Sequence, residues 1–282
     1  MELEATIKMR LDICIPHIVT AFATALQLQL DENKDPLFFK RIHICGLLVQ
    51  FESLLSTHGP EAGMLGDMDV AVKLLKEFKL VFVPKNSLTP MNPQISFANS
   101  PTSPREKIRV NLELPPFPQF LIEWQIENFD DLPQPLKDGE PVIIKPVLFT
   151  QGINEQQTMA IRLGETKLQE TINQENYPLL ADYMIHWLSF ESENNSNLDL
   201  TKHIAKLEEI GNIIDISKSE KNVEILPYTA DFVREIGGIR LTSCKSAKDR
   251  TSMSVTWEQA RFLNKTYVNN SLNFIFLFLL FL

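Results

Sequence analysis

The sequence predicts a helix-rich protein of mixed α/β class. Apolar residues recur at three- and four-residue spacing through about the first eighty residues, which indicates a bundle of helices. Short apolar runs and apolar–polar alternation begin at Ile108 and indicate strands mixed with further helices. We therefore expect a helical region over residues 1–83, a mobile linker over 84–107, an α/β domain over 108–263 and an atypical apolar tail over 264–282.

Three helices are expected in the N-terminal region, each with an apolar stripe. The first stripe is Leu11, Ile15, Ile18, Phe22 and Leu26, with Pro16 starting or bending the helix. The second stripe is Phe38, Ile42, Cys45 and Val49. The third helix has Asp67 as its N-cap and buries Ala71, Leu75, Phe78 and Phe82. His17 and His43 have no cysteine or carboxylate at ligand spacing, so we expect packed histidines and no metal site.

The linker is predicted from its composition. Prolines stand at positions 84, 90, 93, 101 and 104 amid asparagine, serine and threonine. Such a segment cannot bury enough apolar surface to offset the entropy lost on ordering. Ser100 and Ser103 each precede a proline and are either phosphorylation sites or, as the composition favours, ordinary solvated serines.

In the second half, strands precede helices. Residues 108–114 alternate as a half-buried strand does, and the runs 142–144 and 147–149, on either side of Pro146, are expected to be strands. Asn154 is expected to cap a helix.

The remaining elements follow in order. Helices are expected over residues 177–190, 200–210 and 222–236, and Gly237 with Gly238 ends the last of these. A short strand over 239–242 leads into a loop, and the next helix begins near Ser252.

Composition narrows the function classes. The net charge of −9 and the lack of a long lysine or arginine run argue against nucleic acid as a partner. Three scattered cysteines without a CxxC motif suit a reducing compartment. The N-terminus lacks the basic and apolar regions of a signal peptide, so we expect a cytoplasmic protein.

The loop between the last strand and the last helix carries the chemistry. Arg250 lies six residues after Cys244 (a CX5R spacing), whereas neither Cys14 nor Cys45 has an arginine at that distance. A cysteine thiolate can attack a phosphate ester while loop N–H groups and the arginine fork hold the phosphoryl oxygens. The same positive field would lower the pKa of the thiol.

Other loop residues extend this hypothesis. Lys245 and Lys248 suit a substrate with several phosphates, or else only solvate an exposed turn. Thr251 either stabilises the departing thiolate or simply starts the helix. Asp249 either donates a proton to the leaving alcohol, the role we favour, or orients Arg250.

The loop sequence Cys-Lys-Ser-Ala-Lys-Asp-Arg-Thr, residues 244–251, resembles the signature of the inositol polyphosphate 4-phosphatases, types I and II. The segments 152–158 (Gly-Ile-Asn-Glu-Gln-Gln-Thr) and 238–243 (Gly-Ile-Arg-Leu-Thr-Ser) agree, and the resemblance extends to about Gln259. It implies an α/β domain like that of cysteine-dependent phosphatases with a phosphate-binding CX5R loop. Because the resemblance ends near Gln259, we expect that domain to be incomplete here.

The resemblance also implies an activity and site roles. It implies a phosphoric monoester hydrolase that removes the 4-phosphate of phosphatidylinositol 3,4-bisphosphate, or of soluble inositol polyphosphates, through a phosphocysteine and without a metal or other cofactor. Cys244 would be the nucleophile and Arg250 would bind the transferring phosphoryl group, with Asp249 and Thr251 in the catalytic roles above. The substrate-binding residues would be those that remain in the loop, Lys245, Ser246, Ala247 and Lys248. The protein would work at peripheral membrane surfaces, visited transiently from the cytoplasm.

The chain departs from this family at both ends. Family members are longer, with a C2-like N-terminal region and further helices beyond Gln259. Here residues 274–282 are all apolar, too few to span a bilayer as a helix. An alternative is therefore a truncated, inactive fragment that binds partners or phosphoinositides. A dual-specificity protein phosphatase is disfavoured by the loop lysines and by Ala247 and Asp249, where glycines are common.

Overall fold

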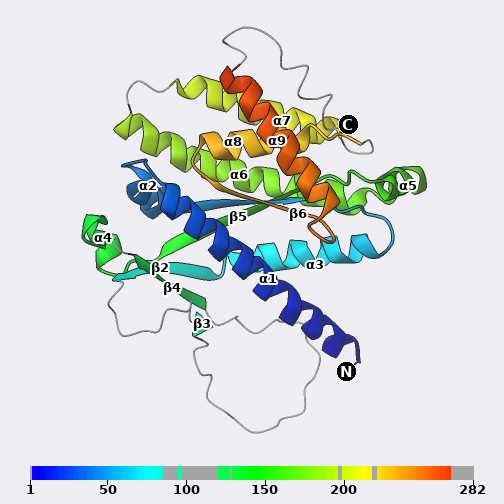
Figure 1. Ribbon diagram of the computed structural model, residues 1–282, viewed down its shortest axis with the longest axis horizontal. Helices are drawn as coiled ribbons and strands as arrows, with labels where there is room; N and C mark the ends of the chain where they lie inside the picture. The colour runs from blue at the N-terminus through cyan, green and yellow to red at the C-terminus, as the bar shows by residue number, and fades with distance from the viewer. Residues whose placement is uncertain are drawn as a thin grey trace.

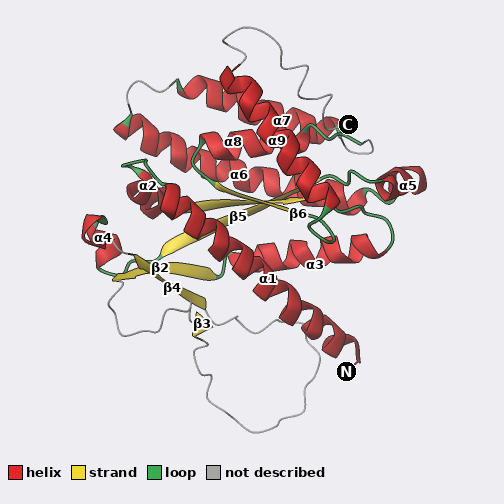
Figure 2. Ribbon diagram, in the orientation of Figure 1, coloured by secondary structure: helices red, strands yellow, loops and turns green. Residues whose placement is uncertain are grey.

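The computed structural model describes residues 2–84, 95–96, 120–126, 129–195, 199–217 and 221–267. A sheet lies between helices on both of its faces (Figures 1 and 2). One face packs against α1 (Glu2–Glu32), α2 (Phe38–Cys45) and α3 (Pro60–Leu75). The other packs against α6 (Lys167–Asn194) and α8 (Ile225–Glu235), and α7 (Leu200–Ile216) packs in turn against these two helices. The remaining helical elements are η1 (Phe129–Asp131), α4 (Gln134–Lys137), α5 (Glu155–Leu163) and α9 (Asp249–Tyr267).

The sheet has six strands in the order β3-β4-β2-β5-β1-β6. Their bounds are Leu47–Ser53 for β1, Phe78–Pro84 for β2, Ile95–Ser96 for β3, Phe120–Ile126 for β4, Val142–Thr150 for β5 and Ile239–Ser243 for β6. β1 runs parallel to both β5 and β6, and Phe51 lies opposite Leu148 on one side and Leu241 on the other. β2 is parallel to β4 and antiparallel to β5. The helix-rich, mixed α/β class is thus confirmed.

The expected N-terminal helical bundle is wrong, because two strands of the sheet come from the first 84 residues. β1 is buried along its whole length, as a central parallel strand is, and its apolar run carries no periodicity of its own. Phe78 and Phe82 lie on β2 and not on a helix. Residues four apart share a face in a strand as well as in a helix, so their spacing did not distinguish the two.

Two other boundaries also differ from expectation. α3 begins at Pro60, where the N–H that proline lacks is not needed, so Asp67 lies inside the helix and is not its N-cap. Pro16 does not start a helix, because it lies inside α1, which begins at Glu2. The strand expected over residues 108–114 and most of the expected linker fall outside the described residues.

The two runs around Pro146 form one strand, β5, rather than two. Pro146 is tolerated because the edge of β5 that faces away from β1 is not bonded to β2 along its whole length; the described pairing with β2 is at Val142 and Ile143. Farther along the same edge, side-chain amides of α6 take the place of a strand. Asn176 accepts from the Leu148 N–H at 2.8 Å, and Asn173 bonds both the N–H and the carbonyl of Thr150 at 2.9 Å.

The remaining predicted elements of the second half are confirmed, with α6 longer than expected at both ends and α7 longer at its C-terminal end. The Asn154 side chain caps α5 by accepting from the Gln157 N–H at 3.2 Å. Gly237, with φ of +78°, follows α8 in a backbone conformation that side-chain-bearing residues rarely adopt. This turn directs the chain into β6 beside β1.

We predict that Asn173→Ala destabilises the fold by about 2–4 kcal/mol, because it leaves a buried N–H and a buried carbonyl of Thr150 without partners. Urea unfolding followed by circular dichroism measures this change. Asn195→Ala, at the exposed end of the same helix, is the matched control and should stay within about 0.5 kcal/mol of the wild type. Equal stability of the two variants would show that the edge of β5 does not need the amide.

Candidate active site

The candidate site lies where three adjacent parallel strands end. β6 leads into Cys244, β1 into Leu54, and β5 into the turn that ends at Asn154. Because β5, β1 and β6 are parallel, these three segments meet at one edge of the sheet (Figure 2). The Leu54 N–H donates to the Ser243 carbonyl at 2.9 Å and the Gln151 N–H donates to the Ser53 carbonyl at 3.1 Å, so the pairing continues to the loop itself.

The Cys244 thiol is half-buried at the N-terminus of α9. The Thr251 hydroxyl lies 3.1 Å from the sulfur. Burial alone would raise the pKa of Cys244, but the Thr251 hydroxyl and the backbone N–H groups of Ser246, Thr251 and Ala247 outweigh it and lower that pKa below its ordinary value. The stability that the thiolate contributes is therefore present above the ordinary thiol pKa and is lost as pH falls through the lowered one.

The loop backbone is strained to reach this arrangement. Ala247 has φ of +50°, in the left-handed region that favours glycine, and it is the one non-glycine with positive φ among the described residues. Such a conformation costs about 1–2 kcal/mol for a residue with a Cβ. The Ala247 N–H is one of those that stabilise the sulfur, so the strain coincides with a group that the thiolate uses.

Arg250 is held by a buried carboxylate from the other half of the chain. Its two terminal nitrogens contact both oxygens of Glu61 at 2.8 and 2.6 Å, and Nη1 also donates to the Leu54 carbonyl at 2.8 Å. The Glu61 carboxylate is fixed in turn by the Ser56 N–H at 2.9 Å and the Asn154 amide at 3.4 Å. Only the guanidinium Nε and the remaining Nη2 proton are left over from these bonds.

Arg250 and Glu61 each shift the pKa of the other in the direction that favours its ionised form. Burial tends to raise the pKa of Glu61, but Arg250, the Ser56 N–H and the charge of Lys245 together lower it. The hydrogen bond to Glu61 raises the pKa of Arg250. Both groups therefore stay ionised, and Glu61 orients the guanidinium beside the loop.

The tip of the loop faces solvent. The five residues between the thiol and Arg250 are all exposed: Lys245, Ser246, Ala247, Lys248 and Asp249. Asp249 is the first residue of α9, so its carboxylate lies at the positive end of the helix. The structure thus brings Cys244, Arg250 and Thr251 together at the base of the loop and leaves both lysines at its rim.

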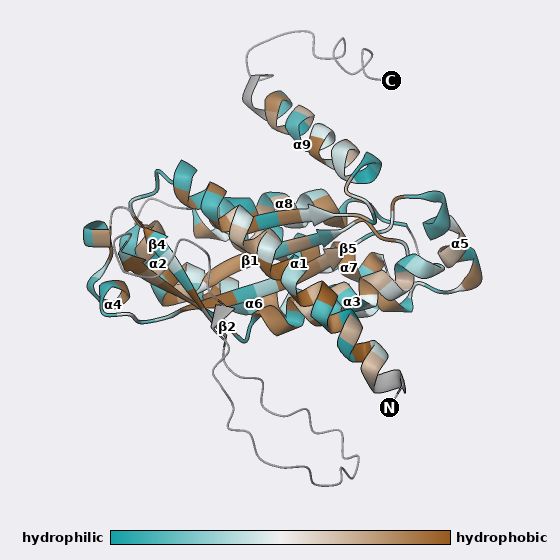
Figure 3. Cartoon of the chain, turned by 60° about the horizontal axis from the view of Figure 1, so that its bottom comes forward, coloured by the Kyte–Doolittle hydropathy of each residue, from teal (hydrophilic) through white to brown (hydrophobic). Residues whose placement is uncertain are grey.

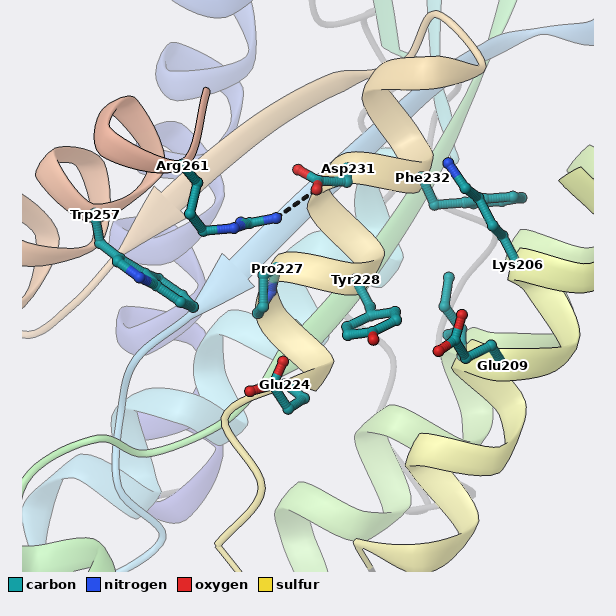
Figure 4. Close-up of a pocket in the computed structure, with 10 residues that line it drawn as sticks. Lys206, Glu209, Glu224, Pro227, Tyr228, Asp231, Phe232, Trp257 and Arg261 are labelled. Atoms are coloured by element: carbon teal, nitrogen blue, oxygen red, sulfur yellow. Dashed lines mark hydrogen bonds and ion pairs between the residues drawn. The ribbon is translucent and has the colours of Figure 1, made fainter. Parts of the chain in front are cut away.

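The helix after the loop, α9, lies on the outside of the protein and contacts it mainly through α8 and β6. Figure 3 shows α9 beyond α8, with polar and apolar residues on its surface. Figure 4 shows Trp257 and Arg261 of α9 directed toward α8, where Arg261 pairs with Asp231. These two residues line a pocket of about 390 Å³, together with Tyr228 of α8 and the α7 side chains Lys206 and Glu209. No residue of the reactive loop lines this pocket.

The histidines and acidic residues do not form a metal site in the described part of the chain, where no group of three or more potential ligands converges. His17 is exposed rather than packed as expected, and its Nδ1 lies 2.7 Å from the Ile13 carbonyl. His43 is half-buried, 3.7 Å from a Glu140 carboxylate oxygen.

A family model for the INPP4A C-terminal domain matches residues 1–275, nearly the whole sequence. The chain belongs to this family. The type II inositol 3,4-bisphosphate 4-phosphatase of Pongo abelii and the inositol polyphosphate 4-phosphatase type II of Homo sapiens are each 38% identical to it over 257 residues. Both alignments cover 87% of this chain but only 25% of the relative, so the chain spans about a quarter of these relatives' length.

A more distant relative has a different name. The human phosphatidylinositol 3,4,5-trisphosphate-dependent Rac exchanger 2 protein is 24% identical over 249 residues, which is 79% of this chain and 15% of that protein. This chain is therefore similar in sequence to part of a protein that is not named as a phosphatase.

The sequence did not indicate the two carboxylates of the site, Glu61 and Glu52. Glu61 follows Gly59-Pro60 at the start of α3, where an acidic residue is ordinary, and its partner is 189 residues away. Glu52 ends an apolar run in β1 and bonds Arg240 of β6. A charged residue in a run that is otherwise buried was the available signal, but it required β1 to be recognised as a central strand.

We predict that Thr251→Val slows alkylation of Cys244 by iodoacetamide about tenfold at neutral pH, since a hydrogen bond to the thiolate is lost. Mass spectrometry of the Cys244 peptide measures the rate across a pH series. Thr256→Val, at an exposed position of the same helix, is the control and should match the wild type. If Thr251→Val also matched the wild type, the hydroxyl would have no part in stabilising the thiolate.

Proposed function

We propose that this chain hydrolyses the 4-phosphate of phosphatidylinositol 3,4-bisphosphate, with soluble inositol polyphosphates as further substrates. The observation that carries the proposal is the half-buried Cys244, whose pKa is lowered by the Thr251 hydroxyl and loop N–H groups against the opposing effect of burial, with Arg250 at the other end of the same loop. Membership of the INPP4A C-terminal domain family and the names of the two 38%-identical relatives support the choice of substrate.

The reaction proceeds in two steps. The Cys244 thiolate attacks phosphorus, the bond from phosphorus to the inositol oxygen breaks, and that oxygen takes a proton from the Asp249 carboxyl group. Arg250 binds two oxygens of the phosphoryl group during the transfer. Water then attacks the phosphocysteine and gives a proton back to the Asp249 carboxylate, the sulfur–phosphorus bond breaks, and inorganic phosphate leaves. Thr251 stabilises the departing thiolate through the hydroxyl that lies 3.1 Å from the sulfur.

The exposed rim of the loop supports a substrate with more than one phosphate. Lys245 and Lys248 are exposed on either side of Ser246 and Ala247, where they meet phosphates that Arg250 does not hold. A lipid substrate requires the protein to work at a membrane surface, reached from the cytoplasm.

A non-catalytic role is the second candidate, and the similarity to the Rac exchanger favours it. That relative aligns over most of this chain and is not named as a phosphatase. In this reading the domain binds a phosphoinositide headgroup or a protein partner without turnover. A protein phosphatase is the third candidate, and the two loop lysines weigh against it.

We predict that Cys244→Ser reduces phosphate release from phosphatidylinositol 3,4-bisphosphate in mixed vesicles by at least about a thousandfold, since a serine hydroxyl at this position is not ionised. A colorimetric phosphate assay measures the rate. Cys14→Ser is the control, because Cys14 lies on α1, and it should retain wild-type activity. No release by wild type above Cys244→Ser would leave the binding role, and equal rates on a phosphotyrosine peptide would favour a protein phosphatase.

We further predict that Glu61→Gln lowers kcat/KM for this substrate at least about tenfold, because Arg250 loses the ionised partner that fixes its orientation. Initial rates over a range of substrate concentrations separate the change in kcat from that in KM. Glu155→Gln, an exposed residue in the first turn of α5, should be unaffected. A wild-type kcat/KM in Glu61→Gln would mean that the loop orients Arg250 without the carboxylate.

A further inference from the structure

A second buried carboxylate, Glu52, lies beneath the reactive loop. It is near the end of β1 and has no exposed surface. Arg240 of β6 donates through Nη2 to both of its oxygens at 3.0 and 2.9 Å. The hydroxyls of Thr242, also in β6, and Ser254, in α9, lie within hydrogen-bond distance of Oε1 at 3.2 and 3.3 Å.

These partners come from both ends of the loop. β6 ends at Ser243, immediately before Cys244, and α9 begins at Asp249, just before Arg250. One carboxylate therefore binds side chains of the strand that enters the loop and of the helix that leaves it. The Ser243 side chain also bonds the main chain of Glu52, since its hydroxyl lies 3.4 Å from the Glu52 carbonyl oxygen.

We infer that Glu52 is a positioning residue, which clamps the two ends of the reactive loop and so keeps the loop N–H groups on the Cys244 sulfur. This inference rests on the proposed function in giving Cys244 a reactive role. Glu52 itself does not touch the substrate; it acts through β6 and α9.

The helix needs such a clamp because apolar packing does little to hold it. The described α9 side chains are all half-buried or exposed, and Met253 is 66% exposed and Phe262 59% exposed. The contacts of α9 with the body are polar instead. Glu258 pairs with Arg240 and Arg234, and Arg261 pairs with Asp231.

Arg240 joins these polar contacts to the clamp. It binds Glu52 through Nη2 and Glu258 through Nη1, so one guanidinium connects the sheet to α9. A carboxylate taken fully out of water requires such compensation. Because the planar Arg240 guanidinium bonds both oxygens of Glu52, this pair holds position as well as neutralises charge.

A clamp and a simple charge predict opposite changes at Cys244. A negative charge near the thiol disfavours the thiolate, so if Glu52 acted only through its charge, removing it would make Cys244 more reactive. If Glu52 holds the loop, removing it lets the N–H groups move away from the sulfur, and Cys244 becomes less reactive at neutral pH.

The test uses the full chain and three variants. Glu52→Gln removes the charge and weakens the bonds to Arg240, and Ser254→Ala removes only the bond to α9. Glu191→Gln is the matched control, because Glu191 is also a buried partner of an arginine, at 3.0 Å from Arg41, but joins α6 to α2. The rate of Cys244 alkylation by iodoacetamide is followed across a pH series by mass spectrometry of its peptide, and phosphate release is measured in parallel.

We expect Glu52→Gln to slow alkylation at neutral pH about tenfold and to shift the whole pH profile toward alkaline pH. Ser254→Ala should slow it about threefold, and Glu191→Gln should leave the profile in place even if it lowers thermal stability. Retention of far-ultraviolet circular dichroism shows that a variant is folded.

Several results would overturn the clamp. Faster or unchanged alkylation in folded Glu52→Gln would do so, as would an equal slowing in Glu191→Gln. If Glu52→Gln does not fold, the Ser254→Ala variant provides the test. A pH profile of Cys244 alkylation in Ser254→Ala that matches the wild type would then refute the inference. A wild-type chain with a reactive thiol but no phosphate release would instead refute the proposed function and leave the clamp standing.

Discussion

The ion pair between Glu61 and Arg250 is the interaction on which the site depends. It joins α3, in the first third of the chain, to α9 near its end, and it places the guanidinium beside the loop that carries Cys244. The N-terminal region is therefore not an accessory to the α/β part. It supplies the central strand β1 and the carboxylate that orients the arginine, so both halves of the chain build one site.

Burying Glu61 and Glu52 at this end of the sheet costs desolvation energy. Their ion pairs with Arg250 and Arg240 offset that cost. Glu61 lies among the Ser56 N–H, Asn154 and Arg250, whereas Glu52 lies among Arg240, Thr242 and Ser254. Buried ion pairs of this kind often add little net stability compared with apolar packing. What they provide here is geometry, since each one fixes a segment next to the sulfur.

Much of the second half could be predicted from the sequence, and the reason is local. The helices α6, α7 and α8 carry long apolar stripes. Asn154 marks the start of α5 through its side chain, and Gly237 marks the end of α8 through its backbone conformation. β1 and β2 could not be predicted in the same way. A strand buried on both faces has no alternation, and phenylalanines four apart fit either element.

The candidate site shows the same difference between local and long-range features of the sequence. The residues of the loop are close in sequence, so the placement of Thr251 beside Cys244 could be predicted from spacing. Glu61 and Glu52 meet their partners only across 189 and 188 residues of sequence. No periodicity encodes such a pairing. The fold has to place the ends of β1 and β6 side by side before either carboxylate meets its arginine.

The net charge at the loop also depends on these carboxylates. At physiological salt, charges more than about 8 Å apart are largely screened, so the site responds to its own side chains more than to the net charge of −9. Glu61 offsets Arg250, and the Cys244 thiolate offsets one of the two lysines. In the proposed mechanism Asp249 carries the proton that it gives to the leaving oxygen, so it offsets neither lysine before the transfer. One lysine charge therefore remains at the rim of the loop, where it attracts the phosphates that arrive with the substrate.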